Sequence, residues 1–279
     1  MNDKIEIPPL AQTLIETALA GGRAVMAVYA SDFTVQWKSD ETPVCAADRQ
    51  GEEVIVAMLE KAFPGVPIVA EEACAAGRVP AIGEKFFLVD PLDGTKEFVK
   101  RNGEFTVNIG LIENAIPVAG VVLAPVLKRI YVAAQGRAWS GPVDANCSNA
   151  MDLARMTVRQ APDAPVAVAS RSHVTPETEA ALKKAGVEKR RSIGSSLKFC
   201  LVAAGEADFY PRMGPTMEWD TAAGDAVLRG AGGKVTTTDG AALTYGKTKI
   251  AGMRDFENPF FYAVGEASLL ARMTEDEAA

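Results

Sequence analysis

Short apolar runs of β-type composition crowd the first half of this chain and restrict its fold more than any other feature. They cover residues 66–70, 86–89, 105–112, 116–123 and 130–134. The last three are closely spaced, with Glu113-Asn114 at the first connection, as in a meander whose consecutive strands pair. The runs therefore predict a largely antiparallel sheet.

Two longer segments with helical spacing accompany these runs. Apolar side chains recur at every third or fourth position in residues 10–29, and residues 48–63 repeat the pattern until Pro64. Side chains at this spacing share one face of a helix. The first half therefore predicts helices packed on the sheet.

The second half alternates between extended and helical patterns, which is typical of an α/β arrangement. The extended runs are 166–169, 207–210 and 234–238, and the helical ones are 195–204, 221–229 and a segment that begins at Thr175-Pro176-Glu177. A polar stretch follows Gly141-Pro142 and suggests a boundary. We therefore expect an α+β part over residues 1–140 and an α/β part over residues 141–279.

Charge and hydropathy limit the partners of the protein. The formal charge of −7 offers no basic surplus for a nucleic-acid polymer. The first residues lack the basic and then apolar layout of a signal peptide. The longest apolar run, 116–127, contains two prolines and is too short to cross a bilayer. We expect a cytoplasmic protein without a transmembrane segment. Peripheral membrane association, and the choice between monomer and homodimer, stay open.

Cysteine and histidine usage disfavours two kinds of site. The four cysteines lie far apart and form no C-x-x-C pair, so reduced buried thiols are expected in place of a zinc site. A single histidine makes a Ser-His-Asp triad a poor hypothesis.

The segment Asp90-Pro91-Leu92-Asp93-Gly94-Thr95 follows an apolar strand-like run. Asp90 is predicted at the carboxyl end of that strand and Asp93 on the turn that leaves it. Gly94 allows close backbone approach, and the N–H groups of Gly94 and Thr95 suit a phosphate oxygen. The alternative is that Asp93 is only the N-cap of a short helix.

A rival chemistry is excluded by spacing. Aspartyl-phosphate phosphatases of the haloacid dehalogenase type also contain Asp-Gly-Thr, but they need a nucleophilic Asp two residues before their second Asp. That position is Pro91 here, which has no nucleophile.

Two further acidic groups stand at predicted element ends. Glu71-Glu72 follows the run that ends at residue 70, and Asp220 precedes the helix expected from residue 221. Taken singly, the Glu pair reads as solvated surface and Asp220 as an N-cap. Together with Asp90 and Asp93 they offer the hard oxygen ligands that Mg²⁺ prefers. Without a cation they would repel, because two unit charges ~4 Å apart cost about 4 kcal/mol at an effective dielectric of roughly 20.

These residues resemble the signature of the lithium-sensitive phosphatase superfamily that contains inositol monophosphatase. Its parts occur in order over about 185 residues, as Asp48, Glu71-Glu72, the Asp90–Thr95 segment, Trp219-Asp220 and Gly232-Gly233. The resemblance implies a layered α-β-α-β-α sandwich and sensitivity to Li⁺. Relatives commonly carry Thr where this chain has Cys45, which puts a local hydrogen bond in doubt.

The second half most resembles the 3′(2′),5′-bisphosphate nucleotidases of the CysQ type. The similar segments are 170–173, 194–200 and 207–212. This resemblance implies a substrate such as 3′-phosphoadenosine 5′-phosphate, cleaved at the 3′-phosphate to give AMP.

The resemblance also implies roles at the site. Glu71, Asp90, Asp93, Asp220 and the Leu92 carbonyl would hold two or three Mg²⁺ ions. Thr95, oriented by Asp48, would position the attacking water, and Glu71 would share the role of base. Attack would be direct, without a phosphoenzyme. Asp48 has a plainer alternative as a helix N-cap.

The implied substrate site is larger. Its candidates are Asp93, Gly94, Thr95, His173, Ser195, Lys198, Arg212 and Asp220. Lys198 and Arg212 would bind the 5′-phosphate, with Ser195 as a further donor, and His173 would contact the adenine. The alternatives are exposed cations without a specific role, an N-cap serine and a solvated histidine.

Two other functions compete with the nucleotidase. Inositol monophosphatase activity would use the same ions on a different alcohol. A non-catalytic phospho-ligand-binding or metal-binding protein on this fold is the alternative from another class. The presence of every ligand position and of Thr95 disfavours it.

Overall fold

A computed structural model describes residues 6–30, 35–37, 43–170 and 175–274. The first half of the chain builds most of a seven-stranded sheet with the order β3-β4-β5-β6-β7-β8-β9. Its strands are β3 Ile68–Ala70, β4 Lys85–Asp93, β5 Thr106–Glu113, β6 Ile116–Ala124, β7 Arg129–Ala134, β8 Arg137–Pro142 and β9 Ala154–Met156. Only the β3–β4 pair is parallel among these, so the predicted antiparallel character is confirmed.

The second half builds a mixed five-stranded sheet with the order β11-β10-β12-β14-β13. Its strands are β10 Val166–Ala169, β11 Lys189–Ser192, β12 Phe209–Arg212, β13 Lys234–Thr237 and β14 Phe261–Val264. A small separate sheet pairs β1 Val35–Trp37 with β2 Pro43–Cys45. Because β8 crosses residue 140 and β9 lies beyond it, and both belong to the first sheet, the change of sheet falls between residues 156 and 166. The division into residues 1–140 and 141–279 stays a prediction.

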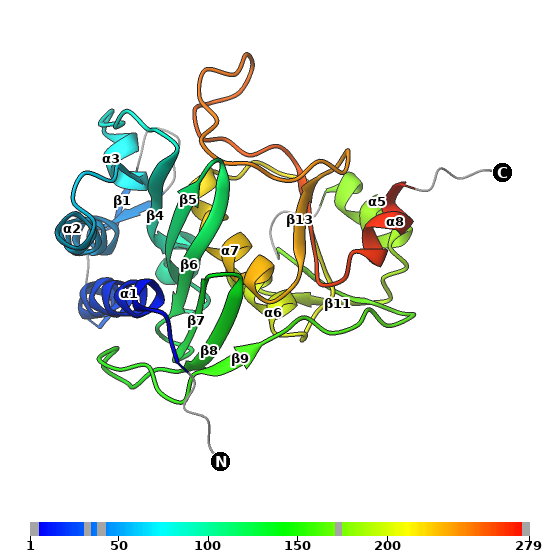
Figure 1. Ribbon diagram of the computed structural model, residues 1–279, viewed down its shortest axis with the longest axis horizontal. Helices are drawn as coiled ribbons and strands as arrows, with labels where there is room; N and C mark the ends of the chain where they lie inside the picture. Colours follow the sequence, from blue (N-terminus) through cyan, green and yellow to red (C-terminus); the bar gives the residue numbers. More distant parts are fainter. Residues whose placement is uncertain (1–5, 31–34, 38–42, 171–174, 275–279) are drawn as a thin grey trace.

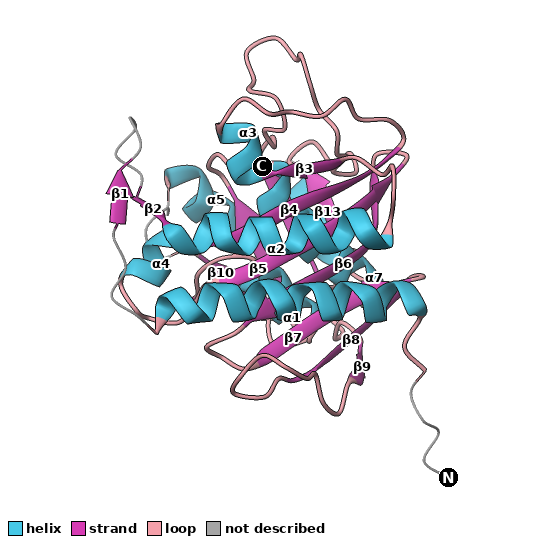
Figure 2. Cartoon of the chain, turned by 90° about the vertical axis from the view of Figure 1, so that its left-hand side faces the viewer, coloured by secondary structure: helices cyan, strands magenta, loops and turns pink. Residues whose placement is uncertain are grey.

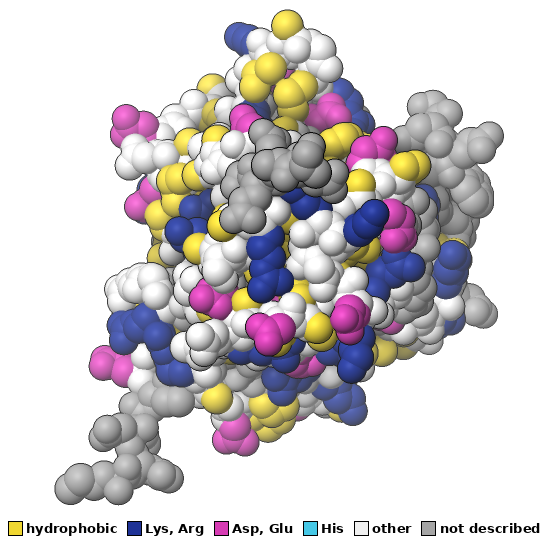
Figure 3. Space-filling view, turned by 90° about the vertical axis from the view of Figure 1, so that its right-hand side faces the viewer, with side chains coloured by type: hydrophobic (Ala, Val, Ile, Leu, Met, Phe, Trp, Pro, Cys, Tyr) yellow, Lys and Arg dark blue, Asp and Glu magenta, His cyan; other side chains and the backbone are white. Residues whose placement is uncertain are grey.

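Helices and sheets alternate in layers, as the family resemblance implies. In Figure 1 the order runs from α1 and α2 through the large sheet, α6 and α7 to the small sheet, and then to α5 and α8. Figure 2 shows α1 and α2 side by side across the outer face of the large sheet. The helices of seven or more residues are α1 Pro9–Tyr29, α2 Ala46–Ala62, α5 Pro176–Lys184, α6 Leu197–Ala203, α7 Ala222–Gly230 and α8 Ser268–Thr274. On the face that includes the α5 and α8 layer, acidic side chains lie between the basic ones (Figure 3).

Short helices stand where the candidate residues lie. They are α3 Glu71–Ala75, α4 Thr95–Val99 and the 3₁₀ turn η1 Glu218–Asp220. Among the described residues, no helix is both long enough and apolar enough to span a membrane.

Two glycines set the distance between α7 and the large sheet. A Cβ at Gly110 would lie 2.8 Å from the Cβ of Ala222, and one at Gly120 would lie 2.9 Å from the Cα of Ala223. Contacts this short are not tolerated, so only glycine lets the helix approach β5 and β6 so closely. This packing brings η1, which directly precedes α7, to the end of β4.

Candidate active site

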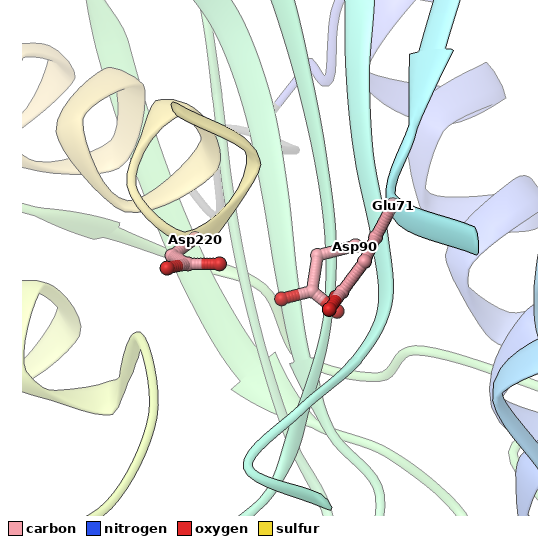
Figure 4. A group of neighbouring side chains, drawn as sticks. All are labelled: Glu71, Asp90 and Asp220. Atoms are coloured by element: carbon pink, nitrogen blue, oxygen red, sulfur yellow. The ribbon is translucent and has the colours of Figure 1, made fainter. Parts of the chain in front are cut away.

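Three carboxylates from distant parts of the chain gather at one point. Glu71 begins α3, Asp90 lies in β4, and Asp220 ends η1. Each offers an oxygen, and these oxygens all lie within 4.8 Å of one another. Figure 4 shows the three side chains pointing toward a common centre. We call this set the carboxylate group.

A bulge in β4 separates the two aspartates of the first motif. The strand continues to Asp93, beyond the end expected from the sequence, but its register with β5 shifts between Asp90 and Asp93. Pro91 cannot donate to the ladder, which is why prolines inside sheets occur at bulges. The backbone N–H of Leu92 instead donates to Asp90 Oδ1 at 2.9 Å.

Backbone N–H groups orient the other aspartates in the same way. Asp93 Oδ2 accepts from the N–H of Ser196 at 2.6 Å, and Asp220 Oδ2 accepts from the N–H of Met217 at 2.8 Å. Each aspartate is thus held through one oxygen, and the other oxygen remains as a possible metal ligand. Asp93 lies outside the carboxylate group, but its charge acts on both Asp90 and Asp220.

The electrostatics of the site favour a bound cation. Burial raises the pKa of Asp90 well above its usual value, and the charges of Glu71, Asp93 and Asp220 raise it further. Burial and the charges of Asp93 and Glu71 likewise raise the pKa of Asp220. Crowded, buried carboxylates are stabilised when a cation stands between them. An all-oxygen donor set suits a hard divalent ion, so the residues present fit a metal site.

The plain capping alternatives are wrong for four of the acidic and polar candidates. Gly94, at φ 95°, is the N-cap of α4, and Thr221 is the N-cap of α7. Asp48 is buried inside the first turn of α2, which begins at Ala46. Ser196, and not Ser195, is the N-cap of α6. An N-cap role therefore does not account for Asp93, Asp220, Asp48 or Ser195, although Asp220 Oδ2 accepts the backbone N–H of Met217, the N-cap of η1.

A cavity of about 410 Å³ adjoins the carboxylate group through Asp220. Seven candidate residues line it, namely Asp93, Gly94, Thr95, Ser195, Lys198, Arg212 and Asp220. Thr95 Oγ1 lies 3.5 Å from the carbonyl oxygen of Leu92. His173 lies outside the described residues. The roles assigned to these side chains, and the orientation of Thr95 by Asp48, stay predictions.

Lys198 is not an exposed cation, so that alternative is wrong. Its side chain is 5% exposed, and Nζ donates to the carbonyl of Ser195 at 2.6 Å. Burial lowers the pKa of Lys198 to about 8, although the charge of Asp93 opposes the shift. Arg212 is half-buried and donates to the carbonyls of Gly214 and Pro215. We call Lys198 and Arg212 the cation pair.

Ser195 has a hydroxyl without a partner. Its Oγ is buried and makes no hydrogen bond within the described part of the chain, and the residue lines the cavity. Its backbone has φ 48°, a left-handed conformation that is uncommon outside glycine and asparagine. A strained residue with an unsatisfied donor in the wall of a cavity is a candidate ligand-binding position.

Two buried polar residues beside the site, Asn108 and Ser196, were not predicted from the sequence. Asn108 Nδ2 donates to Ser196 Oγ at 3.0 Å, and Ser196 contacts both Asp93 and Asp220. A signal was present for Asn108, because a lone amide interrupts the apolar run of residues 105–112. The hydroxyl of Ser196 had no such signal.

The sequence is similar to one family of known proteins. The model of the inositol monophosphatase family matches residues 6–263. The 3′(2′),5′-bisphosphate nucleotidase CysQ of Salmonella typhimurium is 45% identical over 236 residues, which cover 84% of this chain and 93% of that protein. The protein of the same name from Escherichia coli strain K12 is 45% identical over 232 residues, with 82% and 91% covered.

Solved structures give the same result. The crystal structure of CysQ from Bacteroides thetaiotaomicron aligns with a TM-score of 0.74 and 39% identity, covering 94% of this chain and 99% of that one. The extragenic suppressor protein suhB of Bartonella henselae aligns with a TM-score of 0.72 and 26% identity, covering 96% and 99%. From the matched family model, the relatives and the clustered carboxylates, we conclude that the chain belongs to the inositol monophosphatase family of metal-dependent phosphatases.

Proposed function

We propose that the protein is a Mg²⁺-dependent 3′(2′),5′-bisphosphate nucleotidase that converts 3′-phosphoadenosine 5′-phosphate to AMP and phosphate. One observation carries the proposal: a single cavity contains both Asp93 and Asp220 and the cation pair, Lys198 and Arg212. A substrate with two separate phosphates can use both, one at the metal ligands and one at the cations. Relatives that are 45% identical are named for this activity.

Glu71, Asp90, Asp93, Asp220 and the Leu92 carbonyl would hold the metal, with two or three ions. Bound Mg²⁺ supplies a water of lowered pKa and stabilises the charge on the phosphate and on the departing oxygen. The chain contributes fixed positions: backbone N–H groups hold one oxygen each of Asp90, Asp93 and Asp220. Ligands held this way need little reorganisation when the ion binds.

The reaction needs a positioned water and no covalent intermediate. Thr95, the first residue of α4, would accept a hydrogen bond from that water, with Asp48 and Glu71 assisting. The oxygen of water bonds to phosphorus while the bond from phosphorus to the 3′ oxygen breaks in line, and the alcohol leaves with a proton. The N–H groups of Gly94 and Thr95 would bind the transferred phosphate.

The 5′-phosphate would remain on the product and lie against the cation pair. Lys198 contributes a positive charge with little exposure to solvent, and Arg212 contributes a planar fork of donors. The unpartnered hydroxyl of Ser195 would donate a further hydrogen bond. An inositol monophosphate has no second phosphate for these three groups, which favours the nucleotidase over that alternative.

A phosphate-release panel tests the proposal. The substrates are 3′-phosphoadenosine 5′-phosphate, 3′-AMP, inositol 1-phosphate and fructose 1,6-bisphosphate, each with Mg²⁺ and with a chelator. We expect the highest kcat/KM for the first substrate and no release without metal. A large preference for inositol 1-phosphate would overturn the choice of substrate.

A further inference from the structure

Asn108 is a buried amide on the same stretch of sheet as the metal ligands. It lies in β5 directly opposite Asp90 and is 0% exposed. Its Nδ2 donates to Ser196 Oγ at 3.0 Å and lies 3.5 Å from Asp93 Oδ2. An amide in such a place costs free energy unless it is hydrogen-bonded, so its burial beside Asp90 and Asp93 calls for a role.

Ser196 connects Asn108 with two of the acidic residues. Its Oγ lies 2.6 Å from the backbone oxygen of Asp220 and 3.1 Å from Asp93 Oδ2. A hydroxyl has one proton to donate, and the shorter distance assigns it to the Asp220 carbonyl. The hydrogen bonds then run from Asn108 Nδ2 to Ser196 Oγ and from Ser196 Oγ to Asp220. The backbone N–H of Ser196 separately holds Asp93 Oδ2 at 2.6 Å.

The orientation of the Asn108 amide follows from its neighbours. If the amide were turned over, its oxygen would face the Asp93 carboxylate, and Ser196 Oγ would lose its donor. The Asn108 amide nitrogen and the Ser196 backbone N–H therefore both lie at Asp93 Oδ2. Asp93 Oδ1 is then the oxygen that remains for an ion. Asn108 and Ser196 thus determine which oxygen of Asp93 is available and where the backbone of η1 stands.

The same contacts hold the turn that carries the cavity-lining residues. Gly194 donates its backbone N–H to Glu104 Oε2 at 2.8 Å, while Ser196 donates its own to Asp93. Two carboxylates beside the large sheet therefore fix the turn between β11 and α6. Ser195 lies in that turn and Lys198 follows it at the start of α6, so the positions of both cavity-lining residues depend on the turn.

We propose that Asn108 and Ser196 are positioning residues for metal binding. Their hydrogen bonds hold Asp93 and the Asp220 backbone at the separation that the ions require, and no contact with the substrate is needed. The inference rests on the proposed function only in taking Mg²⁺ as the metal. Removing partners of this kind typically weakens metal affinity by about 10–100-fold.

The test is a Mg²⁺ titration by calorimetry in the absence of any substrate. Asn108→Leu keeps the side-chain shape but removes the donor, and Ser196→Ala removes only Oγ. Thr106→Val is the matched control, because Thr106 is equally buried in β5, two residues away, and its hydroxyl makes no hydrogen bond in the described structure. We expect Mg²⁺ affinity to fall about 10–100-fold in the first two variants and to change less than about twofold in the control.

A second readout separates positioning from general stability. A merely structural role would lower the melting temperature without metal but leave the Mg²⁺ affinity of the folded protein unchanged, and that result would overturn the proposal. If Asn108→Leu does not fold, Ser196→Ala alone decides, since it removes a single atom. Because no substrate is present, a protein that binds Mg²⁺ but fails to hydrolyse 3′-phosphoadenosine 5′-phosphate refutes the proposed function without affecting this inference.

Discussion

The carboxylate group and the cation pair lie beside one cavity but have opposite electrostatic problems. In the first, like charges are buried together, so the pKa values of Asp90 and Asp220 are raised. In the second, burial lowers the pKa of Lys198 to about 8, although the charges of Asp93, Glu97 and Glu104 oppose the shift. Each region is unfavourable in the free protein and becomes favourable when a ligand of opposite charge binds. Under the proposed function, a metal ion would complete the first region and a second phosphate the second.

The largest expected effect comes from breaking the carboxylate group. Asp90→Asn removes a buried ligand charge without changing the shape of the side chain. A metal ion is worth several kcal/mol in such reactions, so kcat should fall by at least about 10³-fold at saturating Mg²⁺. Steady-state phosphate release measures the loss, with exposed Asp152→Asn as the control. Retention of a tenth of the activity would mean that Asp90 is not a ligand.

The cation pair should affect binding rather than chemistry. Lys198→Met should raise KM for 3′-phosphoadenosine 5′-phosphate by about 10–100-fold, because hydrogen bonds to charged groups contribute roughly 1.5–3 kcal/mol. The KM for 3′-AMP, which lacks the 5′-phosphate, should change little. Exposed Lys100→Met serves as the control. Equal effects on both substrates would show that Lys198 does not distinguish the second phosphate.

The lowered pKa of Lys198 predicts a pH dependence. Burial favours the neutral amine, so the free enzyme loses this charge as the pH rises through about 8, below the range of an ordinary lysine. KM for the bisphosphate should then rise by up to about tenfold per pH unit above that point. A KM profile from pH 6.5 to 9.5 measures it. The same rise in Lys198→Met would assign the titration to another group.

The last expected effect is thermal. Mg²⁺ at about 100 times its Kd should stabilise the protein by about 2.7 kcal/mol, or roughly 5–10 °C in melting temperature. The raised pKa values of Asp90 and Asp220 stabilise the metal-free fold at low pH, and this contribution is lost as the pH rises through them. The Mg²⁺-induced shift should therefore be larger at pH 8 than at pH 5. A shift that is equal at both values, or absent, would contradict a buried acidic metal site.

Local sequence patterns predicted the parts of the fold that depend on local physics. The apolar faces at 10–29 and 48–63 became α1 and α2, and the run at 166–169 became β10 with those bounds. The strands that were missed depend on their neighbours. β11 reads Lys-Arg-Arg-Ser and is exposed throughout, so nothing in its own composition indicates pairing with β10.

The candidate site shows the same division. The Asp90–Thr95 segment could be predicted as part of a site because two aspartates, a glycine and a threonine lie within six consecutive residues. The link between Asn108 and Ser196 joins residues 88 positions apart, and no local pattern encodes it. The burial of Lys198 also could not be foreseen, since a lysine in a sequence is exposed by default. Interactions that arise only when two sheets meet around α6 and α7 require the structure.

Anomalous diffraction from crystals grown with Mn²⁺ in place of Mg²⁺ tests the central claim most directly. We expect at least one strong peak between Glu71, Asp90 and Asp220, within coordination distance of an oxygen from each. Crystals in which these three side chains surround no anomalous scatterer, while Mn²⁺ supports activity, would contradict it.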